Sequence, residues 1–291
     1  MPGEGGRSGT TTVLPMNGLR RPRAVARIGA VALFALLAAC TGKQPAASTT
    51  STAADRAVAI GSPAALTVQV VATIPRGERA FTQGLELIDG ALYESTGLLG
   101  QSGVQELDPQ TGAVRRRVNL PHDLFGEGLT GVGSRLYQST WQNHLVIVYD
   151  RRTLTELTRF ANPREGWGIC FDGTRLILSD GSSRLTFRDP ETFAELGGVD
   201  VTRSGEAVAR LNELECVDGQ VYANVWRTST LVAIDPESGQ VTAQIDASSL
   251  VPPTATDPND VLNGIASVGD GKFIVTGKRW PSLFVVTLTR Q

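Results

Sequence analysis

The sequence has few of the residues on which metal centres and disulfide scaffolds depend. Of its 291 residues only two are His, His122 and His144, and only three are Cys. Two histidines argue against a His-rich zinc site, and three cysteines are too few for a disulfide framework. A basic excess is missing too. Without residues 1–39, which hold five Arg and one Glu, 22 basic and 28 acidic residues remain, a net charge near −6. We therefore expect no nucleic-acid partner.

Long apolar runs are absent as well, since the longest one covers only residues 28–39. Such a run is too short to span a bilayer. It follows an arginine cluster and ends in Leu-Ala-Ala-Cys40, and these are the parts of a secretory signal. The ending resembles a bacterial lipobox, in which the Cys becomes the lipidated first residue. We predict a lipoprotein signal peptide over residues 1–39, with an ordinary signal peptide as the alternative and Met16 as a candidate start.

The segment after the signal has almost no large apolar residues. Residues 40–63 are rich in Ala, Ser and Thr, a composition that cannot build a core. We predict a lipidated Cys40 and a flexible tether, which would place the protein on the outer face of the cell membrane, or in the periplasm or medium. Residues 64–291 would form one domain, expected to be monomeric.

That domain contains a repeat. Two short apolar runs around Asp-Gly, Gly-Ser or a similar turn, a hairpin signal, occur five times: in residues 84–96, 128–140, 168–180, 214–226 and 264–276. After each of the first four copies comes another strand that ends in an aspartate, followed by Pro in three of the four. The spacings of Asp108, Asp150, Asp189 and Asp235 suit one four-stranded propeller blade per repeat.

The fifth copy is incomplete, because only residues 283–288 follow its hairpin. The missing outer strand is available at the other end of the domain, in residues 66–74. An N-terminal strand that completes the last blade would close the ring and leave no unpaired end strand. The sequence thus predicts an all-β fold, a five-bladed β-propeller whose last blade is closed by the N-terminal strand.

Polar and aromatic residues interrupt the repeat where each blade begins. The first strand of each blade starts in residues 81–86, 125–130, 165–168, 211–215 or 262–266. Residues 140–141, 225–226 and 276–280 end the next strand in three blades. Equivalent positions around a ring converge on one end of the channel, so we expect these segments to form one pocket.

These segments resemble the signature segments of the plant and bacterial type of glutaminyl cyclotransferase. They read Phe-Thr-Gln-Gly-Leu, Phe-Gly-Glu-Gly-Leu-Thr, Glu-Gly-Trp-Gly, Leu-Asn-Glu-Leu-Glu, Asn-Val-Trp and Leu-Asn-Gly-Ile-Ala, with Thr-Gly-Lys near the end. The resemblance covers about residues 66–288 in the same order. It implies a five-bladed propeller that converts the N-terminal glutamine of peptides or proteins to pyroglutamate and releases ammonia, with no metal or cofactor. The animal enzyme is a different, zinc-dependent α/β fold.

The resemblance also implies roles for individual residues. Glu127 matches the catalytic glutamate, and the matches to substrate-binding groups are the polar Gln83, Asn212 and Lys278 and the aromatic Trp141, Trp167 and Trp226. Each has a structural alternative: Glu127 as a solvated turn residue, the tryptophans as core, Asn212 as a turn cap and Lys278 as an edge charge. We expect Glu86, Glu213, Glu215 and Trp280 to be structural, and Phe81 and Phe125 to line either the pocket or the core.

The chemistry explains why these residue types are needed. One carboxyl can take a proton from the attacking α-amine and give it to the departing nitrogen. That role requires a glutamate whose pKa an apolar pocket has raised toward neutrality. Lys278 or the amides of Gln83 and Asn212 would stabilise the oxyanion.

Two other functions remain open at this point. One is a non-catalytic propeller lipoprotein, a binding or assembly module. The other is a calcium-dependent propeller hydrolase with ligands such as Glu127, Asn212 and Asn263. The sequence also leaves open whether Cys170 and Cys216 form a disulfide or remain buried thiols.

Overall fold

The computed structural model describes residues 62–291, and within that range the chain is built almost wholly of β-strands. The one helical segment there is a 3-10 turn, η1 (Ser248–Leu250). The predicted all-β class is therefore confirmed. No helix among the described residues is long and apolar enough to cross a membrane. The predicted signal peptide, Cys40 and nearly all of the tether lie outside the described residues.

Three sheets each contain four antiparallel strands in chain order. The first holds β2 (Thr82–Ile88), β3 (Ala91–Thr96), β4 (Gly103–Leu107) and β5 (Val114–Asn119). The second holds β6 (Gly126–Val132), β7 (Arg135–Thr140), β8 (Leu145–Asp150) and β9 (Glu156–Ala161). The third holds β10 (Ile169–Phe171), β11 (Leu176–Ser179), β12 (Arg184–Arg188) and β13 (Glu195–Asp200).

A further sheet has eight strands and contains both ends of the described chain. Its order is β16 (Leu211–Val217), β17 (Gln220–Val225), β18 (Thr230–Ile234), β19 (Val241–Asp246), β1 (Ala64–Pro75), β22 (Ser282–Arg290), β21 (Lys272–Gly277) and β20 (Leu262–Gly269). β1 pairs antiparallel with β22 from Leu66 to Pro75 and parallel with β19 from Ala64 to Thr67. A separate two-stranded ribbon contains β14 (Thr202–Arg203) and β15 (Glu206–Ala207), and Thr202 also forms a single bridge to Gln240, next to β19.

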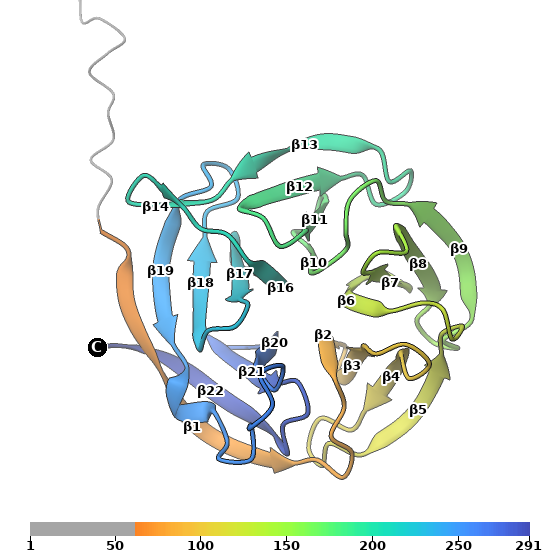
Figure 1. Cartoon of the computed structure of the whole chain (residues 1–291), viewed down its shortest axis with the longest axis horizontal. Helices are drawn as coiled ribbons and strands as arrows, with labels where there is room; N and C mark the ends of the chain where they lie inside the picture. The colour runs from red at the N-terminus through yellow and green to blue at the C-terminus, as the bar shows by residue number, and fades with distance from the viewer. Residues whose placement is uncertain (1–61) are drawn as a thin grey trace, which may run out of the picture. The chain divides into compact units, whose positions relative to one another are not determined.

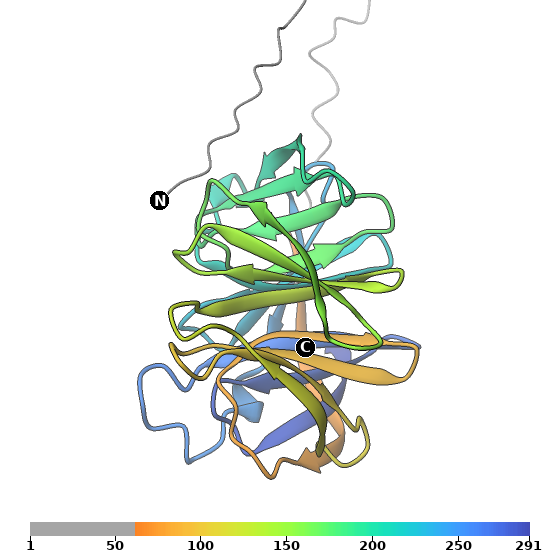
Figure 2. The same ribbon diagram turned by 90° about the vertical axis from the view of Figure 1, so that its right-hand side faces the viewer.

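Five runs of four strands are arranged around a common centre. Three of them are the four-stranded sheets, and the other two are the halves of the eight-stranded sheet, β16–β19 and β20–β22 with β1 as its fourth strand. The first strand of each run, β2, β6, β10, β16 or β20, lies nearest the centre, and the fourth lies at the rim (Figure 1). Seen from the side, the successive sheets lie above one another with loops at both edges (Figure 2). One set of loops and strand ends therefore surrounds each end of the central axis. Each of these two ends is called a mouth of the centre below.

The apolar core lies between neighbouring runs rather than inside one of them. One cluster joins Tyr93 and Val104 of the first sheet to Leu129 and Ile147 of the second. Four similar clusters follow. Two of them join the second sheet to the third and the third sheet to β16–β19. The other two join β16–β19 to β20–β22, and β20–β22 to β2 and β3. Because the clusters follow one another around the centre, each run is stabilised by apolar burial on both faces.

The repeated aspartates stabilise the turns that follow the third strands. Asp108, Asp150, Asp189 and Asp235 each accept a hydrogen bond from a backbone N–H two or three residues further on. Each aspartate ends the third strand of its run or directly follows it, before the fourth strand begins. A side chain that satisfies the backbone of the turn in this way fixes where the outer strand begins.

Cys170 and Cys216 form a disulfide, which settles the alternative that the sequence left open. Their Cα atoms are 5.4 Å apart. Cys170 belongs to β10 and Cys216 to β16, so the bond links two neighbouring runs within one apolar cluster. It closes a chain segment with a sequence separation of 46 residues, which restricts the unfolded chain more than a short loop would.

The inner strands approach one another closely at the centre of the molecule. Four of the five have a glycine there, either within the strand or just before it: Gly84, Gly128, Gly168 and Gly264. A Cβ atom at Gly84 would lie 2.3 Å from the Leu129 nitrogen, and one at Gly128 would lie 2.6 Å from the Ile169 nitrogen. At Gly168 the corresponding contact, with the Asn212 oxygen, would be 2.1 Å. The backbones can approach this closely only where there is no side chain.

The equivalent position of the remaining strand, β16, is Glu213. Its side chain is 1 % exposed, and its carboxylate accepts hydrogen bonds from the backbone N–H groups of Leu85 in β2, at 3.1 Å, and Ile265 in β20, at 2.8 Å. The carboxylate therefore ties three inner strands together across the centre. This agrees with the structural role expected for Glu213.

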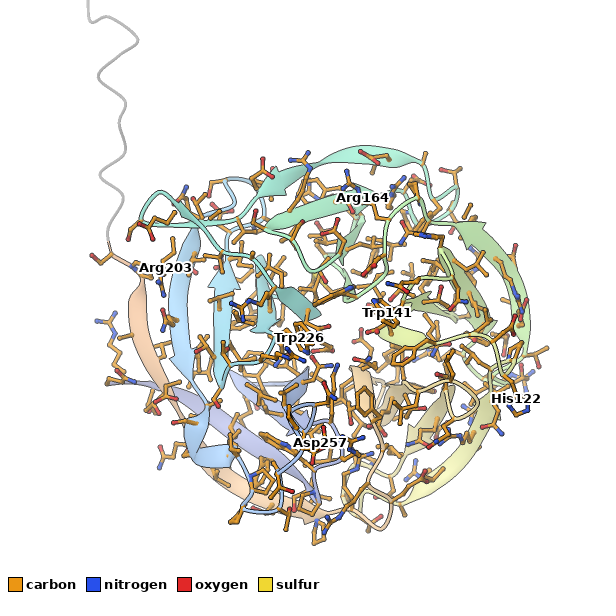
Figure 3. The ribbon with its side chains drawn as sticks, viewed as in Figure 1. His122, Trp141, Arg164, Arg203, Trp226 and Asp257 are labelled. Atoms are coloured by element: carbon orange, nitrogen blue, oxygen red, sulfur yellow. A yellow bond between two sulfur atoms is a disulfide. The ribbon has the colours of Figure 1, made fainter. Side chains whose placement is uncertain are left out.

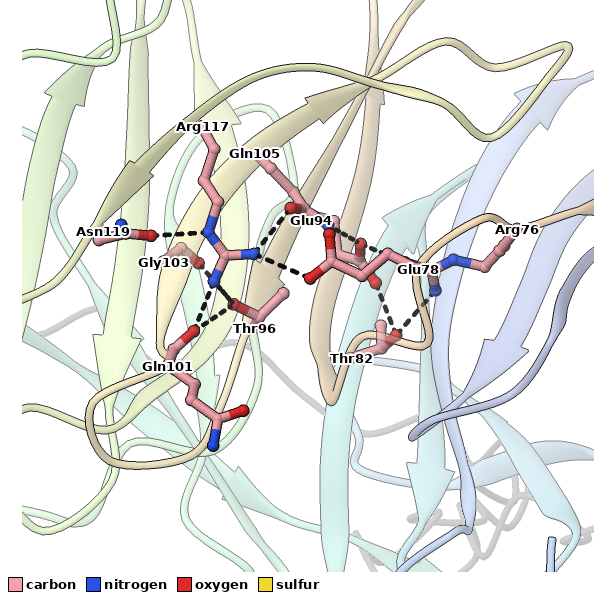
Figure 4. Close-up of polar contacts among 10 residues, drawn as sticks. All are labelled: Arg76, Glu78, Thr82, Glu94, Thr96, Gln101, Gly103, Gln105, Arg117 and Asn119. Atoms are coloured by element: carbon pink, nitrogen blue, oxygen red, sulfur yellow. Dashed lines mark hydrogen bonds and ion pairs between the residues drawn. The ribbon is translucent and has the colours of Figure 1, made fainter.

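A buried polar network holds the chain where it enters β2. Arg76 donates to Glu94 at 2.5 Å, and the other Glu94 oxygen accepts from Thr82 at 2.6 Å (Figure 4). Gln105 donates to the same carboxylate at 2.6 Å. Both charged side chains are almost fully buried, and such a pair is costly to break because removal of one partner leaves an uncompensated charge. Thr82, and with it the neighbouring Gln83, is thereby fixed.

We predict that Gly84→Ala lowers the free energy of unfolding by about 1–3 kcal/mol, because the new methyl group overlaps the backbone of β6. Denaturant unfolding measures the change. Gly77→Ala is the control, since a Cβ atom there would meet nothing within 4 Å. Equal stability of the two variants would contradict the crowded centre.

Candidate active site

Five side chains occupy equivalent positions at one mouth of the centre. They stand directly before the glycine or Glu213 of each inner strand: Gln83, Glu127, Trp167, Asn212 and Asn263. The strand register shifts at this point in β2, β6, β16 and β20. A shift of this kind, a β-bulge, turns side chains away from the regular alternation. The bulges thus direct polar groups toward the mouth.

A second set of side chains follows the second strand of three runs. Trp141 comes after β7, Trp226 after β17 and Lys278 after β21. Trp141 and Trp226 both lie near the middle of the molecule in this view (Figure 3). The two sets therefore meet at the same mouth, as the sequence predicted.

The mouth holds a pocket of about 300 Å³. All seven residues predicted for the site line it. The full lining is Phe81, Gln83, Leu98, Phe125, Glu127, Trp141, Trp167, Asn212, Trp226, Asn259 and Lys278. Phe81 and Phe125, which were expected in either the pocket or the core, line the pocket. Trp280 is fully buried in the core.

Sequence reasoning missed two lining residues, Leu98 and Asn259. Both lie in loops outside the repeated hairpins, so no repeat position marked them. Leu98 has a φ of 80°, a conformation that a branched side chain rarely adopts. Leu98 lines the pocket in this conformation.

Aromatic rings form two walls of the pocket. In one wall Phe125 lies edge to face with both Phe81 and Trp141, at centroid distances of 6.3 and 5.6 Å. In the other wall Trp167 and Trp226 make an edge-to-face pair at 5.4 Å. Such pairs are favourable beyond the area that they bury. They give the pocket rigid, apolar sides.

Glu127 is held at the base of these walls. It is only 5 % exposed, so it is not a solvated turn residue. Its Oε1 accepts a hydrogen bond from Gln83 Nε2 at 2.9 Å. Asn263 Nδ2 in turn donates to Gln83 Oε1 at 3.3 Å and to the Thr82 carbonyl at 3.0 Å. Asn263 therefore supports the amide orientation in which Gln83 donates to Glu127.

The pocket changes the acidity of its two main ionisable groups. Burial raises the pKa of Glu127 to about 8, while the positive charge of Lys278 opposes that rise and the negative charge of Glu165 adds to it. Burial lowers the pKa of Lys278 to about 8, against the influence of Glu127. Lys278 is 4 % exposed, and its Nζ lies 4.9 Å from the centroid of the Phe81 ring. It is therefore not a solvated edge charge.

Asn212 offers a free acceptor to the pocket. It is 2 % exposed, and its Oδ1 accepts no hydrogen bond from any group within residues 62–291. A buried amide oxygen without a partner is costly unless a ligand satisfies it. The pocket thus combines one acceptor, one cation and one carboxyl that can gain or lose a proton near pH 8.

This arrangement can perform acid–base chemistry on a small polar group between aromatic walls. Within the described part of the chain, no three His, Cys, Asp or Glu side chains gather as metal ligands. Asn263, a candidate calcium ligand, is fully buried and does not line the pocket.

Comparison with known proteins shows the family to which this chain belongs. The model of the family described as glutamine cyclotransferase matches residues 37–288. The chain belongs to the glutamine cyclotransferase family. It is 39 % identical over 227 residues to the glutaminyl-peptide cyclotransferase of Arabidopsis thaliana, covering 76 % of this chain and 71 % of that protein.

A solved structure agrees with this membership. The crystal structure of Myxococcus xanthus glutaminyl cyclase superposes with a TM-score of 0.74 at 38 % identity, over 79 % of this chain and 99 % of that one. As a member of the glutamine cyclotransferase family, this chain carries its buried Glu127 within the matched segment.

We predict that the free energy of unfolding falls as the pH rises from about 4.5 to about 8, in part because of Glu127. Its pKa is raised in the folded protein, so its neutral form is favoured there, and ionisation above the unfolded pKa destabilises the fold. Glu127→Gln should remove this part of the pH dependence in denaturant titrations. An unchanged pH dependence would contradict the burial of the carboxyl.

Proposed function

We propose that this protein is a glutaminyl-peptide cyclotransferase, which converts the N-terminal glutamine of peptides or proteins to pyroglutamate and releases ammonia. The observation that carries the proposal is Glu127, a buried carboxyl with a pKa of about 8, between the aromatic walls of a pocket in a member of this family. The α-amine of a peptide has a pKa of about 7.7–8.0. The two groups are matched, so a proton can pass between them at little cost.

The first step forms the lactam ring. The neutral α-amine attacks the δ-carbon of its own side-chain amide, and ionised Glu127 accepts the proton that the amine loses. Negative charge then develops on the amide oxygen. Lys278, the one positively charged group among the described residues that line the pocket, is suited to stabilise that charge.

The second step expels ammonia. Protonated Glu127 donates its proton to the departing NH₂ group as the carbon–nitrogen bond breaks, and the carboxylate is restored. Atoms balance, because one peptide gives one pyroglutamyl peptide and one ammonia. The aromatic walls would hold the glutamine folded, with its amine near its amide carbon, and Asn212 Oδ1 is placed to accept a substrate N–H.

We propose further that the reaction needs no metal or cofactor. The nucleophile and the electrophile both belong to the substrate residue, and Glu127 and Lys278 supply the proton transfers and the charge stabilisation. A metal-activated water would have no part in such a reaction.

We also infer that the domain is a five-bladed propeller closed by its N-terminal strand. Each run of four strands would be one blade, and β1 would be the outer strand of the blade β20–β22. The antiparallel pairing of β1 with β22 and the apolar clusters between successive runs support this interpretation. It explains why the site lies at one mouth of the centre.

The alternative, a non-catalytic binding module, would not require a carboxyl of raised pKa. A test compares ammonia release from a Gln-initiated dipeptide by the wild type and by Glu127→Gln. We expect kcat to fall by about 10²–10⁴-fold in the variant and the wild-type rate to be unaffected by a chelator. A folded wild type that releases no ammonia would favour the binding module, and inhibition by the chelator would refute the metal-free proposal.

We propose that the protein is an exported bacterial lipoprotein, on the basis of the arginine cluster, the apolar run and Leu-Ala-Ala-Cys40. Cys40→Ser should abolish incorporation of labelled fatty acid and release the domain from the membrane fraction. Continued labelling of the variant would contradict lipidation at Cys40.

A further inference from the structure

We propose that Glu165 is a positioning residue of the active site, whose carboxylate holds two pocket tryptophans in place through hydrogen bonds. The proposal rests on the function proposed above. Glu165 does not line the pocket, so its role would be exerted through other residues.

Three donors converge on the Glu165 carboxylate. Its Oε2 accepts hydrogen bonds from the indole nitrogens of Trp141, at 2.9 Å, and Trp167, at 3.0 Å. Its Oε1 accepts from Gln142 Nε2 at 3.0 Å. An indole has a single polar group, its N–H donor, so one carboxylate satisfies the whole hydrogen-bonding capacity of both rings.

The two rings come from different sheets. Trp141 follows β7 of the second sheet, whereas Trp167 precedes β10 of the third. Trp141 is also 37 % exposed, so packing alone leaves this ring loosely held. Hydrogen bonds to an ionised acceptor are about twice as strong as neutral ones. The carboxylate would therefore set the distance between the two walls across which the substrate binds.

The charge of Glu165 also acts on the catalytic group. Burial by itself would raise the pKa of Glu165. The net shift is nevertheless downward, because hydrogen bonds from Gln142, Trp167 and Trp141 and the nearby His144 lower this pKa more. Glu165 is therefore ionised at neutral pH. Its negative charge raises the pKa of Glu127, and Lys278 lowers it. Glu165 and Lys278 are thus the charged groups that tune Glu127 from opposite directions.

Two variants of the full chain separate these effects. Glu165→Gln keeps an acceptor oxygen but removes the charge, so the acid limb of the kcat/KM profile should move to lower pH while KM stays within about twofold. Glu165→Ala removes the acceptors as well. We expect it to raise KM by about tenfold, in keeping with the loss of hydrogen bonds to a charged group. Glu156→Gln, an exposed carboxylate paired with Arg159 on β9, is the matched charge control.

A spectroscopic readout tests the contacts without relying on activity. The chain has four tryptophans, so a ¹⁵N–¹H spectrum has four indole signals. Glu165→Ala should shift the signals of Trp141 and Trp167 and leave that of the core residue Trp280 in place. Unmoved indole signals would overturn the positioning role of Glu165 even if the enzyme is active. Shifted signals in Glu165→Ala, together with a folded wild type that releases no ammonia, would preserve the positioning role of Glu165 and refute the proposed function. If the acid limb of the kcat/KM profile does not move in Glu165→Gln, the charge of Glu165 does not raise the pKa of Glu127.

Discussion

Close approach of the inner strands is the constraint on which the rest of the structure depends. The strands meet where a Cβ atom at Gly84, Gly128 or Gly168 would overlap the neighbouring backbone, and Glu213 bonds across the same centre to two other strands. Regular pleating is interrupted there, and the side chains just before these positions are turned to the mouth. The residues that crowd the centre and those that form the pocket are therefore neighbours in the sequence, and one short segment per repeat specifies both.

The pocket in turn depends on taking Glu127 out of water. A buried carboxyl is costly when ionised, and here the aromatic walls impose that cost while Lys278 relieves part of it. The result is a group that exchanges a proton near the pKa of a peptide α-amine. Stability and activity are thus linked through one residue: the burial that makes the folded protein less stable at alkaline pH is what fits Glu127 for proton transfer.

Much of this follows from the sequence, because it is carried by repeats. The Asp-Gly turns and the repeated aspartates mark strand ends, and the interruptions of the repeat mark Gln83, Glu127 and Trp167. Residues outside the repeat were not predictable in the same way, since Leu98 and Asn259 reach the pocket from irregular loops. The Cys170–Cys216 bond was not predictable either, because the spacing of the two cysteines allowed proximity without demanding it. The convergence of Trp141 and Trp167 on Glu165 depends on side-chain directions in two sheets, which no local pattern encodes.

The most direct test of the account is a site-specific titration of the Glu127 carboxyl. Wild type and Glu127→Gln labelled with ¹³C at glutamate side chains can be compared by NMR from pH 4 to pH 10, so that the signal absent from the variant is assigned to Glu127. The account predicts a midpoint near 8, the value that burial imposes. A midpoint near the ordinary value of 4.5 would show that the carboxyl remains solvated, and the proton transfer proposed for Glu127 would lose its physical basis.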